Sequence, residues 1–231
     1  MLPLRRLSLG LLASLLALTA TLCPAADADE ASLRKAVTLY ASFDEAVRLD
    51  FGSGEPVPGT RSVAADKKFV FDQGFDPKFF RIAKDKGISG GCLEAVDLPP
   101  RGGRLWFPAK GNVAFKKDAG WGGAPLTRLK AVGFKAGEWH HIVLTWDRFN
   151  TGSKDGAHTL YVDGKKIGDL QNYEVGMDWD IERARVYFAV NLIGLLDELA
   201  VFQRPLTAEE VALLHKKPGV LQPLQQQRRQ P

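Results

Sequence analysis

The sequence predicts an all-β protein, an antiparallel β-sandwich with one short helix near its C-terminus. Apolar and polar residues alternate with a period of two through most of the chain. Clusters of Gly and Pro separate the short candidate strands, and only one segment carries a strong start signal for a helix. The chain has 231 residues and 45% of them are hydrophobic, which is enough to build the core of one all-β domain.

The first 28 residues are expected to be a signal peptide. Arg5 and Arg6 form a positive start, an apolar run spans 7–22, and small residues at 26–28 match a signal-peptidase site. The apolar run is shorter than the roughly 20 residues of a membrane-spanning helix, although a signal anchor is the alternative. We therefore expect a secreted, periplasmic or cell-surface protein with no membrane span after cleavage.

Residues 29–217 are predicted to form one domain, and residues 218–231, rich in Gln and Pro, a disordered tail. The clearest strand, 139–146, is apolar on both faces, as expected of a central strand. Asp163-Gly164 predicts a hairpin with a type I′ turn, and Thr207 to Glu210 fits a capping box. Further strands are expected at 37–43, 69–71, 91–95, 105–107, 159–162, 165–168, 185–190 and 195–202.

The charge and cysteine content limit the chemistry that this chain can perform. The formal net charge is +4, with 31 basic and 27 acidic residues interspersed, so nucleic acid is not an expected partner. Cys92 alone would remain after cleavage, and its context predicts a small buried residue in a strand. His140 and His141 would point to opposite faces of a strand and could not share one metal ion.

Four motifs, in order, resemble a known family. They are GEWHHIVLTWD at 137–147, LYVDGK at 160–165, IGLLDELAVF at 193–202 and RPLTAEE at 204–210, with Phe43-Asp44-Glu45 similar to the opening strand. This order resembles the laminin-G-like jelly roll, a concanavalin A-like lectin/glucanase sandwich found in secreted bacterial proteins. The family usually has one or two further strands before the Trp-His-His motif, and these are shortened or lost in 121–133.

The resemblance implies a calcium ion that ties the first strand to the last, with oxygen ligands near Asp44 and Asp197. Calcium prefers carboxylate and carbonyl oxygens, and extracellular modules bind it at about 10⁻⁴–10⁻³ M. The alternative is structural, with Asp44 capping a turn and Asp197 accepting a backbone hydrogen bond.

Asp178, Asp180 and Glu182 would share one face if they lay on a strand. The triplet is similar to the acidic residues of glucanases in this superfamily. Those triplets begin with Glu, however, whereas this one begins with Asp. The preferred interpretation is therefore that the three side chains are solvated carboxylates. No catalytic residue is therefore predicted. Trp121, between glycines, and Trp179, between aspartates, are candidate ligand platforms, although burial is the usual fate of such rings.

The sequence thus predicts a non-catalytic recognition module that binds glycan or an extracellular protein, with calcium assisting. One alternative is a polysaccharide-cleaving enzyme on the same sandwich, which needs paired carboxyl groups across a groove. The other is a structural surface protein that assembles through exposed sheet edges.

Overall fold

The computed structural model describes residues 29–97, 104–108, 110, 134–148, 150–174, 180, 182–190 and 192–227. All statements below concern these residues. The expected signal peptide, Trp121, Trp179 and the segment 121–133 lie outside them, so the structure gives no information on those four predictions.

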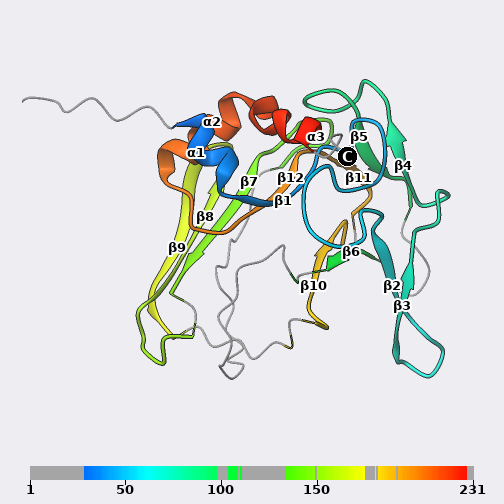
Figure 1. Cartoon of the computed structure of the whole chain (residues 1–231), viewed down its shortest axis with the longest axis horizontal. Coiled ribbons are helices and arrows are strands. Elements are labelled where there is room, and N and C mark those ends of the chain that lie inside the picture. Colours follow the sequence, from blue (N-terminus) through cyan, green and yellow to red (C-terminus); the bar gives the residue numbers. More distant parts are fainter. Residues whose placement is uncertain are drawn as a thin grey trace, which may run out of the picture.

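The described strands form antiparallel sheets, as the all-β prediction requires (Figure 1). One sheet has the order β10 (Arg185–Phe188), β6 (Arg104–Pro108), β2 (Gly59–Val63) and β3 (Phe69–Gln73). A second has the order β11 (Gly194–Leu196), β5 (Cys92–Ala95) and β4 (Phe80–Ala83). A third has the order β7 (Ile142–Asp147), β8 (Gly156–Val162) and β9 (Lys165–Tyr173), and β1 (Val37–Ala41) pairs with β12 (Leu199–Phe202).

A first hydrophobic core lies between the inner face of the β10–β6–β2–β3 sheet and the strands β1, β4 and β5. Alternation along β6 sends Leu105 and Phe107 inward, where the Phe107 ring stacks on Phe188 with 4.9 Å between ring centroids. The buried members of this core are Leu39, Ala41, Phe43, Val47, Leu49, Phe80, Leu93, Ala95, Leu105, Phe107, Phe188 and Ala189. Two layers of β-structure closing on such a core make a β-sandwich.

A second core lies where the helices cover β1 and the β7–β8–β9 sheet. The helices are α1 (Glu30–Lys35), α2 (Ala208–Lys216), the 3₁₀ turn η2 (Pro218–Leu221) and α3 (Pro223–Gln227), and they gather along one edge of the molecule (Figure 1). Leu39 on β1 belongs to the first core and the adjacent Tyr40 to the second. β1 is therefore buried on both faces, as its alternation allows.

Several local predictions are confirmed. Asp163 and Gly164 have φ angles of 50° and 74°, as a type I′ turn requires. Thr207 and Glu210 form the reciprocal capping box at the start of α2. Cys92 lies in β5 with no exposed surface, and burial raises the pKa of its thiol to about 11.

Two predictions are wrong. The strand at 139–146 was expected at the centre of a sheet, but β7 begins at Ile142 and pairs only with β8 among the described strands. Ile142 is 58% exposed, so its apolar character does not mark burial on that face.

The expected disorder from Pro218 does not hold for 218–227, where η2 and α3 form. The three apolar residues Val220, Leu221 and Leu224 fill the second core, which offsets the entropy of ordering the segment.

Candidate functional site

Strand pairing brings three distant segments of the chain together at one end of β1. Because β1 and β12 are antiparallel, Asp44, which follows β1, lies beside the residues that precede β12, Asp197 and Glu198. Because Leu196 pairs with Leu93 between β11 and β5, Asp197 also lies beside the loop 87–91 that leads into β5. Topology alone therefore places Asp44 and Asp197 against the same loop.

The hydrogen bonds confirm that both aspartates hold this loop. Asp44 Oδ1 accepts from the backbone N–H of Gly91 at 3.1 Å, and Asp44 Oδ2 accepts from Gln225 Nε2 at 2.7 Å. Asp197 Oδ2 accepts from the N–H groups of Ile88 and Ser89 at 2.8 and 3.3 Å. The loop is thus fixed from both sides by carboxylates, and α3 reaches the same place through Gln225.

Glycine is required in this loop because the carboxylates approach the backbone so closely. A Cβ on Gly90 would lie 2.2 Å from Asp44 Oδ1, and one on Gly87 would lie 2.7 Å from Asp197 Oδ2. Contacts this short do not occur between real Cβ atoms and oxygen, so any side chain would force the loop away from the acids.

Glu198 adds a third buried carboxyl group next to the two aspartates. Its Oε2 accepts from the Tyr40 hydroxyl at 2.9 Å, whereas its Oε1 is buried without a hydrogen-bond partner. Burial, together with the neighbouring charges of Asp197 and Asp44, raises the pKa of Glu198 to about 8, against the lowering effect of the hydrogen bond from Tyr40. Burial also raises the pKa of Asp197 to about 6, against the opposing effect of its backbone hydrogen bonds. Burial likewise raises the pKa of Tyr40.

These oxygens suit a calcium ion better than a transition metal, because the donor set contains no nitrogen or sulfur. Asp44 accepts one hydrogen bond at each oxygen and Asp197 Oδ1 accepts one, from Glu198 N at 2.9 Å, so lone pairs remain. No ion pair within the described part of the chain includes Asp44, Asp197 or Glu198. That part also contains no group of three or more His, Cys, Asp or Glu side chains arranged to hold a metal. Two aspartates supply fewer oxygens than the roughly six to eight that calcium takes, so a calcium ion at this place would need further oxygen ligands.

A surface that sequence reasoning missed lies on the outer face of the β10–β6–β2–β3 sheet. We call it the arginine–aromatic face, and its members are Arg61, Phe69, Phe71, Arg104, Trp106, Arg185 and Tyr187. Arg61 pairs with Phe71 on one side and with Arg104 on the other, and Trp106 pairs with Tyr187, so these side chains point the same way. Phe69, Phe71 and Tyr187 are 59%, 46% and 39% exposed.

A glycine shapes this face. A Cβ on Gly59 would lie 2.3 Å from two ring atoms of Trp106, so the indole lies directly on the bare backbone of β2. Trp106 is only 4% exposed although it belongs to the outer face. The buried indole therefore lies beneath the more exposed aromatic rings of this face.

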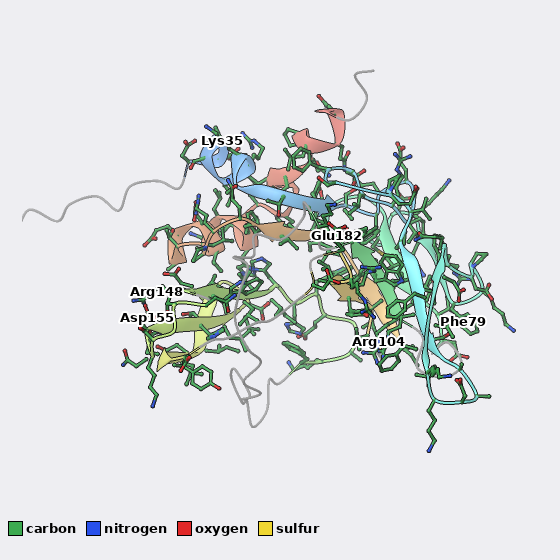
Figure 2. All side chains as sticks on the ribbon, turned by 60° about the horizontal axis from the view of Figure 1, so that its bottom comes forward. Lys35, Phe79, Arg104, Arg148, Asp155 and Glu182 are labelled. Carbon is green, nitrogen blue, oxygen red and sulfur yellow. The ribbon has the colours of Figure 1, made fainter. Side chains whose placement is uncertain are left out.

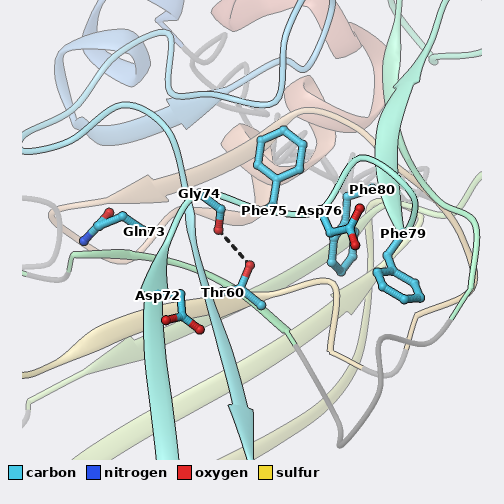
Figure 3. Close-up of a pocket in the computed structure, with 8 residues that line it drawn as sticks. All are labelled: Thr60, Asp72, Gln73, Gly74, Phe75, Asp76, Phe79 and Phe80. Carbon is cyan, nitrogen blue, oxygen red and sulfur yellow. Dashed lines mark hydrogen bonds between the residues drawn. The ribbon is translucent and has the colours of Figure 1, made fainter.

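A hollow of about 370 Å³ lies where β3 leads into β4 (Figure 3). It is lined by Phe75, Phe79 and Phe80 and by the carboxyl groups of Asp72 and Asp76. Thr60 Oγ1 donates to the carbonyl of Gly74 at 2.8 Å and closes one side of it. Its lining therefore combines aromatic rings with hydrogen-bond acceptors.

Two other predicted groups are placed differently from the sequence-based expectation. The N–H groups of Arg183 and Ala184 donate to the carbonyl of Asp180, so this segment turns rather than running as a strand. Asp180 and Glu182 consequently do not alternate along one strand face. His140 and His141 precede β7; His140 Nδ1 lies 3.0 Å from Asp163 Oδ2, and the His141 ring stacks on His215.

The antiparallel sheets packed on two hydrophobic cores, with the helix α2 after the last strand, define a β-sandwich of the jelly-roll class. A laminin-G-like family model, described as the concanavalin A-like lectin/glucanases superfamily, matches residues 90–212, more than half of the chain. The chain belongs to this superfamily, which includes carbohydrate- and protein-binding modules as well as glucanases. Laminin-G-like domains are typically extracellular. No curated protein matches the chain, and no solved structure does. No helix within the described ranges has the length and apolar character needed to cross a bilayer.

Proposed function

We propose that this protein is a secreted, non-catalytic recognition module that binds glycan or an extracellular protein. The observation that carries the proposal is the arginine–aromatic face, where three aromatic side chains on one sheet surface remain 39% to 59% exposed. Exposed aromatic rings clustered on one face are unusual on a soluble domain unless a ligand or partner covers them. The hollow lined by Phe75, Phe79 and Phe80 is a second place with aromatic rings, but its polar groups are the acceptors Asp72 and Asp76 instead of arginines.

The proposal includes a calcium ion bound by Asp44 and Asp197. Its supports are the convergence of both carboxylates on the loop 87–91 and the buried, unpartnered Oε1 of Glu198. When bound, the ion would supply positive charge to a cluster that has three carboxyl groups and no paired cation among the described residues. Asp44 and Asp197 hold the loop and would orient it for a ligand.

The absence of catalysis is also a proposal. It is supported by the turn that begins at Asp180, which is not the strand geometry that would align Asp180 with Glu182; Asp178 lies outside the described residues. Incubation with β-glucans and galactans followed by a reducing-end assay tests it, because a cleaving enzyme releases new reducing ends. Catalytic release above the level of heat-treated protein would overturn this part of the proposal.

The binding function is tested with a glycan array and with capture from extracellular protein extracts, each with about 1 mM calcium and with a chelator. We expect a reproducible set of ligands whose binding depends on Phe69 and Phe71. Failure to bind any glycan or protein in both conditions would refute the recognition function.

The calcium site is tested by thermal unfolding of Asp44→Asn and Asp197→Asn, with Asp169→Asn as the matched control. Asp169 lies on β9 in an exposed ion pair with Lys166, far in sequence from the acidic cluster. Calcium at about ten times its Kd should stabilise the wild type and the control by about 1.4 kcal/mol. Both site variants should lose this effect; an equal response in all four proteins would exclude these ligands.

A further inference from the structure

The arginine–aromatic face is built by strand alternation across three neighbouring pairings. Along β6, Leu105 and Phe107 enter the first core, so Arg104 and Trp106 must face outward. The antiparallel register then places Arg61 beside Arg104 and Tyr187 beside Trp106. Phe69 and Phe71 on β3 complete the face opposite Val63 and Arg61. Arginines and aromatic rings therefore share one face of the sheet, where Arg61 lies between Arg104 and Phe71.

The guanidinium groups lie over the rings. Arg61 Cζ is 3.6 Å from the centroid of Phe69 and 5.7 Å from that of Tyr187. Arg185 Cζ is 4.5 Å from the Trp106 centroid and 5.9 Å from the Phe71 centroid. Stacking holds each planar cation in place, and a guanidinium group stacked on a ring can still donate hydrogen bonds from its edge N–H groups that have no partner. The face thus presents preorganised donors on an apolar surface.

These cations have no acidic partner within the described part of the chain. None of the ion pairs there includes Arg61, Arg104 or Arg185, and Glu182, three residues before Arg185, pairs with Lys110 at 2.7 Å. Arg185 Nη1 donates only to the carbonyls of Glu182 and Ala184. Arg104 Nε, Arg185 Nε and Trp106 Nε1 are buried without a hydrogen-bond partner. Positive charge without an acidic partner among the described residues therefore accumulates on this face, although these three donors themselves lie below its surface.

We propose that the arginine–aromatic face binds an acidic polysaccharide, whose sugar rings stack on the exposed aromatic side chains while its carboxylate or sulfate groups bind the arginines. A guanidinium group binds either anion through two parallel hydrogen bonds, and a ring face binds the apolar face of a sugar. Nucleic acid fits less well, because the net charge of the chain is only +4 and its basic residues are scattered. This inference rests on the proposed recognition function and specifies its ligand.

The test measures Kd for polygalacturonate, which carries carboxylates, for dextran sulfate, which carries sulfates, and for neutral dextran. The variants are Arg61→Gln with Arg185→Gln, the single Arg61→Lys, and Phe69→Ala. Arg148→Gln is the control, because it removes one arginine charge by the same substitution from the end of the β7–β8–β9 sheet, well away from Arg104 (Figure 2). Circular dichroism confirms that each variant folds, and Arg61→Lys retains the charge if the double variant does not fold.

We expect one of the two acidic polymers to bind and neutral dextran not to bind. The double glutamine variant should weaken binding about tenfold or more, Arg61→Lys should weaken it less, and Arg148→Gln should leave it unchanged. Phe69→Ala should also weaken binding, and this loss should persist between about 0.05 and 0.5 M NaCl because ring stacking is not screened by salt.

Four results would overturn the inference. Equal affinity of the double variant and the wild type would show that the arginines do not hold the ligand, while the recognition function would stand. Binding of neutral glycans but of neither acidic polymer would also show that the arginines do not hold the ligand, while the recognition function would stand. Single-stranded DNA binding as tight as the best acidic polysaccharide would show general polyanion binding. A protein that binds no glycan and no protein would lose both the inference and the proposed function.

Discussion

Replacing Leu224 by Ala should strongly destabilise the protein, because α3 is part of the second core. Leu224 is 2% exposed and belongs to a cluster with Leu33, Tyr40 and Val211. The substitution loses the transfer free energy of the removed methyl and methylene groups and leaves a cavity, which together cost about 2–5 kcal/mol. That is a large share of the roughly 5–15 kcal/mol that stabilises a typical domain.

Urea unfolding followed by tryptophan fluorescence measures this loss. With an m value of about 2 kcal/mol per M, the midpoint should fall by about 1–2.5 M urea. Gln226→Ala is the matched control, since Gln226 lies in the same helix and is exposed; its cost should stay within about 0.5 kcal/mol. If the two variants were equally stable, the segment 218–227 would not be packed against the domain, and the expectation of a disordered tail would be restored.

Two further predictions concern the acidic cluster and the arginine–aromatic face. Burial raises the pKa of Glu198 to about 8, so this carboxyl binds its proton more tightly in the folded chain than in the unfolded one. In calcium-free buffer, stability should therefore fall as the pH rises from about 5 to 8. Glu198→Gln should remove part of this fall and stabilise the protein at pH 8 by about 1–4 kcal/mol, whereas a flat wild-type profile would contradict the assignment. Gly59→Ala should cost about 1–3 kcal/mol and change the tryptophan fluorescence, because its Cβ would lie 2.3 Å from the Trp106 ring; an unchanged urea midpoint would contradict this contact.

The sequence predicted the features that depend on neighbouring residues. The Asp163-Gly164 turn and the Thr207–Glu210 capping box both form as expected, since their geometry follows from residue types a few positions apart. The tail was assigned wrongly because Gln and Pro are typical of disorder. The three apolar residues at 220, 221 and 224 stabilise an ordered segment only when they can be buried against β1 and α2, which are distant in the sequence or become neighbours only in the fold.

For the candidate site too, some residues were predicted from the sequence and others were found only in the structure. Resemblance to a family singled out Asp44 and Asp197, and the structure places both against the loop 87–91. Glu198 and Tyr40 were missed, because their hydrogen bond joins residues 158 positions apart in the chain. The alternating aromatic residues at 69 and 71 were a local signal of one strand face, but nothing in that segment indicates that Arg61, Arg104 and Arg185 lie beside them.

By itself, the amino-acid sequence determined the all-β class, the tight turns, the helix start and the acidic residues at the ends of the first and last strands. The first three follow from local backbone preference and side-chain periodicity, whereas the two acidic residues were singled out by the resemblance to a family. Only the tertiary structure decided which strands pair and in what register, and therefore which carboxylates share a loop and which arginines share a face with aromatic rings. The physical reason is that register is set by burying the first core as a whole, a condition that no single strand can satisfy alone.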